Sequence, residues 1–307
     1  WGNNQFTGSL TVSRGQLSLR GATTGSLAAA AALNLNSGGL LRWDDSAGAN
    51  PLGRLGTLPL NVAGGTFELQ GNTSSVSIGS VALTQLPGAV RITGSGSNSV
   101  TLQGVSSATP GALLDLSGVN ALGGTSLVSI APPALLSGSA ALGWNAGVFT
   151  RVFAAGDFVS YDTSKGFVPL SSANYVNLLA ETGSVTSGQD AGVLAGSLAV
   201  SKQLTLNALK LSGAVISGSG ALSLAGGLLL AAAGSNSVSA SQLFAPGTSL
   251  VVQVEPGARL DLNAVVASGV QSLIKVRDGL LRLNGPVLSS GTTILAGGTL
   301  RLAGGLN

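Results

Sequence analysis

Hydrophobic and polar residues alternate along short segments of this chain, and glycine bounds each segment. One heptad recurs: Gly, any residue, Leu or Phe, any residue, Leu, any residue, Gly. Full copies stand at 15–21, 65–71, 220–226, 279–285 and 298–304, and looser copies at 98–104, 112–118 and 207–213. Because successive side chains of a strand point to opposite faces, each heptad predicts a short strand with one buried face and a glycine corner at its end.

The spacing of the heptads predicts how the strands are connected. Gly279 and Gly298 begin two copies that lie 19 residues apart. This distance is too long for a hairpin, and the residues between have no helical periodicity. It fits one coil of a β-solenoid, in which equivalent strands of successive coils stack about 4.8 Å apart. We therefore expect an all-β parallel β-helix, right-handed, with a β-sandwich or barrel as the alternative.

One segment has the composition of a helix. Residues 25–33 read GSLAAAAAL, in which Ser26 can cap the N-terminus and alanine favours helix. The segment is short, so at most two helical turns are expected here.

Aromatic residues are concentrated in one part of the chain. Residues 143–175 contain four of the seven Phe, both Tyr and one of the three Trp. We expect an excursion from the coil stack, which divides the chain into coils at 1–140, an aromatic-rich excursion or lateral subdomain at 141–185, and further coils at 186–307. Its aromatic rings form either a small internal core or a lateral contact that docks a second filament or stacks on sugar rings. The candidates for that lateral contact are Trp144, Phe149, Tyr161 and Tyr175.

The composition excludes several classes of function. Only 8% of the 307 residues are charged, and Lys and Arg stand singly, which argues against nucleic-acid binding. No apolar run approaches the roughly 18 residues that span a bilayer, so no membrane insertion is expected in this segment. There is no Cys or His for nucleophilic catalysis or zinc binding. The first residue is Trp1 rather than Met, which favours a piece of something longer.

The carboxylates do not suggest an active site. Glycoside cleavage needs two carboxylates on either side of one bond. Asp44 and Asp45 are the only adjacent pair, but neighbouring strand residues point in opposite directions. Asp115 and Asp261 stand at equivalent outward positions of two strands. We assign no catalytic, cofactor-binding or metal-binding residue, and no cofactor is expected.

Two stretches resemble a known family. They are SGTTILAGGTLRLAGG (290–305) and FTGSLTVSRGQLSLRG (6–21), the second with Phe6, Thr7, Gly8, Val12, Gly15, Leu17 and Leu19 at motif positions. Both are similar to the bacterial autotransporter-associated β-strand repeat, also called the passenger-associated repeat. The resemblance implies a secreted or surface-exposed bacterial β-helical passenger without an active site.

The two ends of the chain have matching patterns. When Gly291 is aligned with Gly8, Leu300 falls on Leu17 and Leu302 on Leu19. This suggests that the chain is one period of a tandem array or of a head-to-tail polymer of copies of itself. The expected inter-unit contact residues are Trp1, Phe6, Leu300 and Leu302.

The sequence thus favours an extracellular structural fibre or stalk on a bacterial surface. Two alternatives stay open. The first is an adhesin passenger that binds cell-surface glycans or proteins through the aromatic excursion. The second is a polysaccharide-active β-helix enzyme, which would have carboxylates clustered in a lateral groove.

Overall fold

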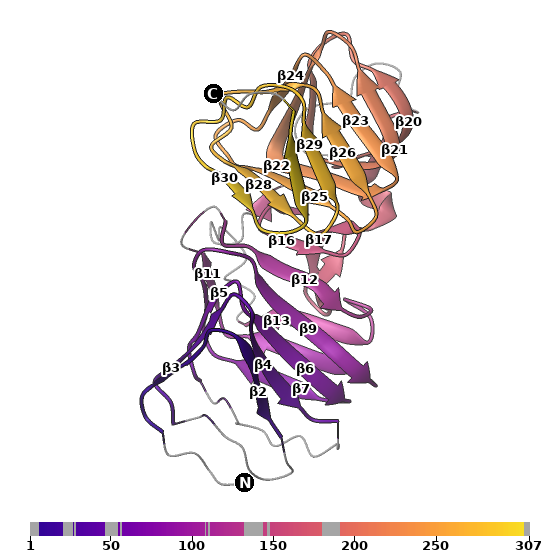
Figure 1. Cartoon of the computed structure of the whole chain (residues 1–307). Helices are drawn as coiled ribbons and strands as arrows, with labels where there is room; N and C mark the ends of the chain where they lie inside the picture. Colours follow the sequence, from indigo (N-terminus) through magenta and orange to yellow (C-terminus); the bar gives the residue numbers. More distant parts are fainter. Residues whose placement is uncertain are drawn as a thin grey trace. The chain divides into compact units, whose positions relative to one another are not determined.

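The computed structural model is an all-β chain in two compact units, Trp1–Pro169 and Leu170–Asn307. It describes residues 6–20, 27, 29–46, 55, 57–107, 109, 111–131, 144–145, 148–179 and 191–303. Within these ranges the only helix is a single 3-10 turn, Ser172–Asn174. Figure 1 shows parallel strands side by side within each unit.

The first unit is a β-solenoid in which each complete coil contributes one strand to each of three faces. The first face contains β1 (Ser9–Val12), β3 (Ala32–Asn36), β5 (Leu60–Ala63), β8 (Val81–Leu83) and β11 (Val105–Ser107). The second contains β2 (Gly15–Leu19), β4 (Gly39–Asp44), β6 (Thr66–Asn72), β9 (Gly88–Ser95) and β12 (Leu114–Val119). The third contains β7 (Ser75–Ile78), β10 (Asn98–Leu102) and β13 (Ser126–Ile130). All pairs within these faces are parallel, which confirms the predicted fold class.

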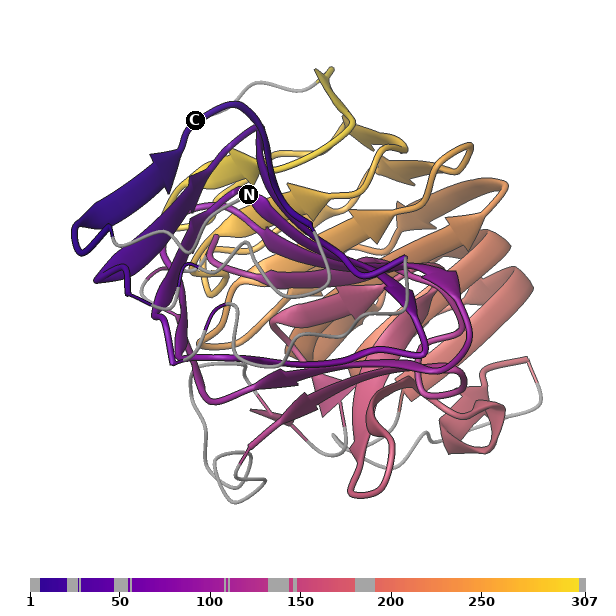
Figure 2. The same cartoon turned by 90° about the horizontal axis from the view of Figure 1, so that it is seen from below.

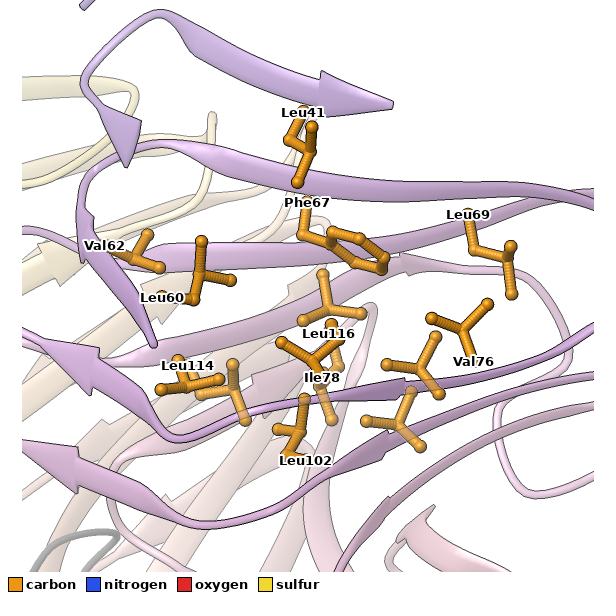
Figure 3. Packing of buried hydrophobic residues seen from close by; sticks show 14 of the residues in the cluster. Leu41, Leu60, Val62, Phe67, Leu69, Val76, Ile78, Leu102, Leu114 and Leu116 are labelled. Carbon is orange, nitrogen blue, oxygen red and sulfur yellow. The ribbon is translucent and has the colours of Figure 1, made fainter. Parts of the chain in front are cut away.

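Stacked apolar columns fill the interior of this unit. Leu41 pairs with Phe67, and Phe67 pairs with Val90 on the following coil. The three side chains are at most 5% exposed. Figure 3 shows side chains of different faces, such as Leu60, Leu69 and Leu102, pointing into one interior. Burial of each such side chain contributes about 1.5–3 kcal/mol before the entropy cost.

The aromatic segment closes one end of this stack. It contains β14 (Trp144–Asn145), β15 (Val148–Phe149), β16 (Val152–Ala154), β17 (Asp157–Asp162) and β18 (Gly166–Pro169). β16 adds in parallel to β12 and β18 to β13, while β17 pairs antiparallel with both β16 and β18. Phe149 and Phe167 are 0% exposed and belong to the same core as Leu41. The segment is thus a cap that shares the core of the coils, rather than an excursion with a small core of its own.

The second unit is also a three-faced solenoid with a core of its own. Its strands are β19 (Tyr175–Asn177), β20 (Ala191–Ala199), β21 (Leu204–Ser217), β22 (Ala221–Ala233), β23 (Ser235–Ser239), β24 (Gln242–Phe244), β25 (Leu250–Val254), β26 (Arg259–Leu262), β27 (Val265–Val266), β28 (Leu273–Val276), β29 (Leu280–Leu283), β30 (Thr293–Leu295) and β31 (Thr299–Leu302). The long strand β22 pairs with β24 through one part and with β25 through another. Figure 2 gives the view from below, in which the coloured strands of each unit wind around an interior.

The helix expected at 25–33 is wrong for the residues that the structure describes. Ala32 and Leu33 begin β3, and Leu33 pairs with Leu10 and Leu60 on the neighbouring coils. A helix of two turns is too short for its hydrogen bonds to offset the unfavourable nucleation step. A strand at this position is instead hydrogen-bonded to a strand on each side and buries Leu33. Gly25, Ser26 and residue 28 lie outside the described residues.

Candidate functional site

The last coil of the second unit leaves apolar side chains uncovered. Leu288, Leu295 and Leu302 lie seven residues apart and are 43%, 49% and 47% exposed. Leu302 pairs with Leu283 of the preceding coil, of which only 2% is exposed. Within the column that Leu283 and Leu302 form, the leucine on the inner strand is therefore buried, and the leucine on the last described strand is half-exposed.

The backbone of this coil is also open on one side. β30 and β31 stand at the two ends of the strand order of their sheet, and among the described strands each has a single partner. Such an edge presents a row of N–H and C=O groups that can pair with another strand. The last described coil thus combines an open ladder with exposed leucine.

The first coil of the first unit has a similar character. Phe6 is 41% exposed, and Leu10 and Leu17 are half-buried. On the next coil their column partners Leu33 and Leu41 are at most 1% exposed. The fourth residue expected at an inter-unit contact, Trp1, lies outside the described residues.

The ladders show how heptads pair inside the chain. Leu17 pairs with Leu41 in one unit, and Leu281 pairs with Leu300 in the other. Gly15, the first residue of β2, likewise pairs with Gly39, the first residue of β4. Equivalent positions therefore stack on each other, and the two open coils present the same pattern, GQLSL at 15–19 and GTLRL at 298–302.

A buried lysine holds the corner of the last coil. Lys275 is 0% exposed, and its Nζ donates hydrogen bonds to the carbonyl oxygens of Val276, Arg277 and Gly297. Burial lowers the pKa of Lys275 to about 8, although the nearby carboxylates of Asp278 and Glu255 oppose that shift. The ammonium group thus joins β28 to the corner that precedes β31.

A second buried polar contact lies beside it. Arg277 forms an ion pair with Glu255 of the preceding coil, with 2.9 Å between Nη2 and Oε2. Gln253 donates to the same carboxylate at 2.5 Å. The Arg277–Glu255 ion pair thus joins two successive coils through charged side chains, whereas most of the residues that pair between β25 and β28 are leucine, valine or isoleucine.

In both units a buried asparagine joins two coils from inside. Asn98 accepts from the N–H of Ser74 at 2.9 Å and donates to the carbonyl of Ser95. Asn236 accepts from the N–H of Ala214 at 3.0 Å and donates to the carbonyl of Ala233. Both are at most 3% exposed. The segment GSNSV, present at 96–100 and 234–238, is the sequence pattern that could have revealed these residues.

Two of the residues expected at a lateral contact, Phe149 and Tyr161, take part in packing within the first unit. The ring of Phe167 makes edge contacts with Phe149 at 5.2 Å and with Tyr161 at 5.3 Å. The Tyr161 hydroxyl lies 3.2 Å from the backbone nitrogen of Ile130, from which it accepts a hydrogen bond. Phe149 is therefore not available to a partner or a sugar.

The other two lateral candidates are placed differently. Tyr175 is half-buried on β19 of the second unit, where the Lys210 ammonium lies 5.3 Å from its ring centre. The backbone of Trp144 pairs with Phe149, and its side chain lies outside the described set. Trp144, Phe149 and Tyr161 thus belong to the first unit and Tyr175 to the second.

The adjacent carboxylates point in opposite directions. Asp44 lies on the outer side, where Arg20 is 2.8 Å away and a hydrogen bond from the Ser46 hydroxyl lowers the pKa of Asp44. Asp45 is 2% exposed and accepts a 2.5 Å hydrogen bond from the Ser74 hydroxyl. The two groups cannot act on one bond, as the strand alternation predicted.

Comparisons with known proteins identify no relative: no family model, curated protein or solved structure matches the chain. Over the described ranges, three or more acidic, Cys or His side chains nowhere gather closely enough to hold a metal ion. Over the same ranges no helix has the length and apolar character of a membrane span. The open coils and the polar outer faces of the units remain as candidate sites.

Proposed function

We propose that this chain is a structural β-solenoid segment of an extracellular fibre or stalk. Its last coil, β30 and β31, stacks on the first coil, β1 and β2, of a following unit. The observation that supports this proposal is the exposure of the leucine column at the last coil, where Leu302 is 47% exposed and its partner Leu283 is 2% exposed.

The direction of the strands favours a head-to-tail arrangement. All ladders at both open coils are parallel. A parallel ladder continues only if the last coil meets the first coil of the next unit, because two identical ends would meet in opposite directions. In the register of the internal pairs, Leu300 then lies on Leu17 and Leu302 on Leu19.

An extracellular, bacterial location is part of this proposal and rests on the resemblance to the passenger-associated repeat. The adhesin alternative requires binding through the aromatic segment, but Phe149 of that segment is buried in the core of the first unit. The enzyme alternative loses its adjacent carboxylate pair, because Asp44 is on the outer side beside Arg20 and Asp45 is buried against Ser74. We assign the chain no catalytic role.

The test is the self-association of the purified 307-residue chain. We expect rods by electron microscopy and a concentration-dependent rise in mass by light scattering. Leu302→Asp places a carboxylate in the stacked column and is expected to abolish association while the fold is retained. Val215→Asp is the matched control, because Val215 is also 42% exposed but lies on β21, which pairs on both sides. A wild-type chain that stays monomeric at high concentration contradicts the proposal.

The native material distinguishes two forms of the same architecture. A tandem array joins the units covalently, whereas a polymer joins them by the ladder alone. The mass of the intact native polypeptide decides between them, and a value near 29.9 kDa excludes the covalent array.

A further inference from the structure

Two guanidinium groups stand on neighbouring strands at the outer face of the second unit. Arg282 on β29 pairs directly with Arg301 on β31. Neighbouring strands lie about 4.8 Å apart. Like charges directly opposite each other destabilise a sheet. A negative group near the two arginines would therefore stabilise this part of the sheet.

The carboxylate beside this pair is already occupied. Asp261 pairs with Arg282 from the other side, on β26. Arg259 on the same strand as Asp261 binds both oxygens of its carboxylate, one of them at 2.9 Å. Asp278 lies in the corner before β29, where its carboxylate acts to raise the pKa of Lys275. Asp261 is therefore the one described carboxylate directly opposite Arg282, its ion pair is with Arg259, and within the described ranges no ion pair reaches Arg282 or Arg301.

Arg282 itself lacks an acceptor. Its Nε atom is buried without a hydrogen-bond partner in the described part of the chain. Residues 191–303 contain seven basic and three acidic side chains, so this part has an excess of positive charge. Arg259 and Arg277 have carboxylate partners, and Lys275 has backbone carbonyls. The arginine pair on β29 and β31 is thus left with an unneutralised charge.

A column of amides and hydroxyls runs beside the arginine pair. Asn263 and Asn284 directly follow β26 and β29, two residues after Asp261 and Arg282, and both are exposed. Asn284 donates to Asn263 at 2.7 Å, and Asn263 donates to Ser239 at 2.8 Å. This column is polar and uncharged, and it runs along the solenoid axis parallel to the arginine pair.

We propose that this face, formed by β26, β29 and β31, binds an acidic polysaccharide. Carboxylates of the sugar chain accept hydrogen bonds from the Arg282 and Arg301 guanidinium groups, whose planar forks match carboxylate geometry. Hydroxyls of the same chain contact the column formed by Ser239, Asn263 and Asn284. A membrane surface or a nucleic acid requires a larger cluster of cations than two arginines.

The site does not depend on stacking of the units. A following unit in the proposed register would place Ser18 beside Arg301, and serine supplies no negative charge. The arginine pair therefore needs its anion in the single chain and in an assembled fibre alike. Failure of one proposal leaves the other intact.

The test is binding of the full chain to polygalacturonate, with the uncharged glucan dextran as the comparison polymer. We expect binding to polygalacturonate that weakens with salt, and no binding to dextran. Arg282→Gln with Arg301→Gln should weaken it at least about tenfold, since hydrogen bonds to charged groups are the strong ones. Arg14→Gln with Lys202→Gln is the matched control, because it removes two exposed charges elsewhere and should bind as the wild type does.

Several results would overturn this proposal. They are unchanged binding by the arginine double variant, an equal loss in the control double variant, and equal binding of dextran. Binding of inorganic phosphate or of phosphatidylserine vesicles in preference to polygalacturonate would also contradict it. If the double variant does not fold by circular dichroism, Arg301→Gln alone is measured, because Arg301 is exposed on the last strand.

Discussion

The Nζ atom of Lys275 lies 3.1 Å from the carbonyl oxygen of Gly297, and this contact joins two successive coils of the second unit. Gly297 belongs to the corner between β30 and β31. The amide of Thr299, just after this corner, donates to the carbonyl of Gly279, and the amide of Ala303 donates to that of Leu283. The conformation of the open coil thus depends on a charged group in the interior.

Substitution of this lysine should loosen the last coil. Lys275→Met keeps the length of the side chain and removes all three hydrogen bonds. A hydrogen bond from a charged group contributes about 1.5–3 kcal/mol, so the amides of Thr299 and Ala303 should exchange with solvent about tenfold faster or more. Native-state hydrogen exchange measures this change. Lys202→Met, at an exposed lysine of the same unit, should leave both rates unchanged.

The stability of the chain should also depend on pH through Lys275. Burial lowers its pKa from 10.5 to about 8, so between these values the unfolded chain binds the proton that the folded chain has released. The free energy of unfolding therefore rises as the pH increases from about 8 to about 10.5. Denaturant unfolding of the wild type and of Lys275→Met across this range isolates the contribution. If both chains show the same pH dependence, the lowered pKa is wrong.

The inward asparagines should contribute more stability than neighbouring outward serines. Asn98→Ala removes an acceptor for the buried N–H of Ser74 and a donor for the carbonyls of Ser95 and Gly96. Leaving such groups unsatisfied costs about 1–3 kcal/mol each, and a total loss of about 3 kcal/mol is expected. Ser99→Ala removes an exposed hydroxyl contact to Ser75 and should cost less than about 0.5 kcal/mol. Chemical denaturation compares the two variants.

One glycine of the first unit should not tolerate a side chain. A Cβ atom on Gly39 would lie 2.1 Å from the carbonyl oxygen of Val12 on the preceding coil. Backbone must then move, and Gly39→Ala is expected to destabilise the fold by about 3 kcal/mol, as overpacking does. At Gly269 a Cβ atom meets nothing within 4 Å and φ is ordinary, so Gly269→Ala should be nearly neutral. Equal unfolding midpoints for the two variants would contradict this packing.

The alternation of the heptads predicted the parallel stacking and several of the strands, but the corners expected at Gly213 and Gly226 are wrong, because β21 and β22 run through these glycines. The heptad at 279–285 contains β29, the heptad at 298–304 contains β31, and Leu281 pairs with Leu300 exactly 19 residues later. The prediction works because period two and a fixed coil length are local properties of the sequence. The alanine-rich segment misled it, since helix propensity is weaker than the two ladders that Leu33 joins.

The roles of single side chains depended on long-range contacts and were not visible in the sequence. Phe149 and Phe167 form a cap because β16 and β18 happen to follow β12 and β13 in the stack. Nothing in the sequence indicates that Lys275 is buried, but it pairs with Val252 of the preceding coil, whose side chain lies in the core. Such placements follow from which strands become neighbours, and that information is spread over the whole chain.

The most direct test of head-to-tail stacking uses the absence of Cys from the chain. In the proposed register Thr299 of one unit lies beside Gln16 of the next, and both side chains are exposed. Neighbouring strands bring Cα atoms to about 4.8 Å, within the range of a disulfide. Two single variants, Gln16→Cys and Thr299→Cys, are mixed under mild oxidation. The account predicts a mixed disulfide dimer as the main product. A mixture that yields only monomers, or Gln16→Cys and Thr299→Cys homodimers in place of the mixed species, would contradict it.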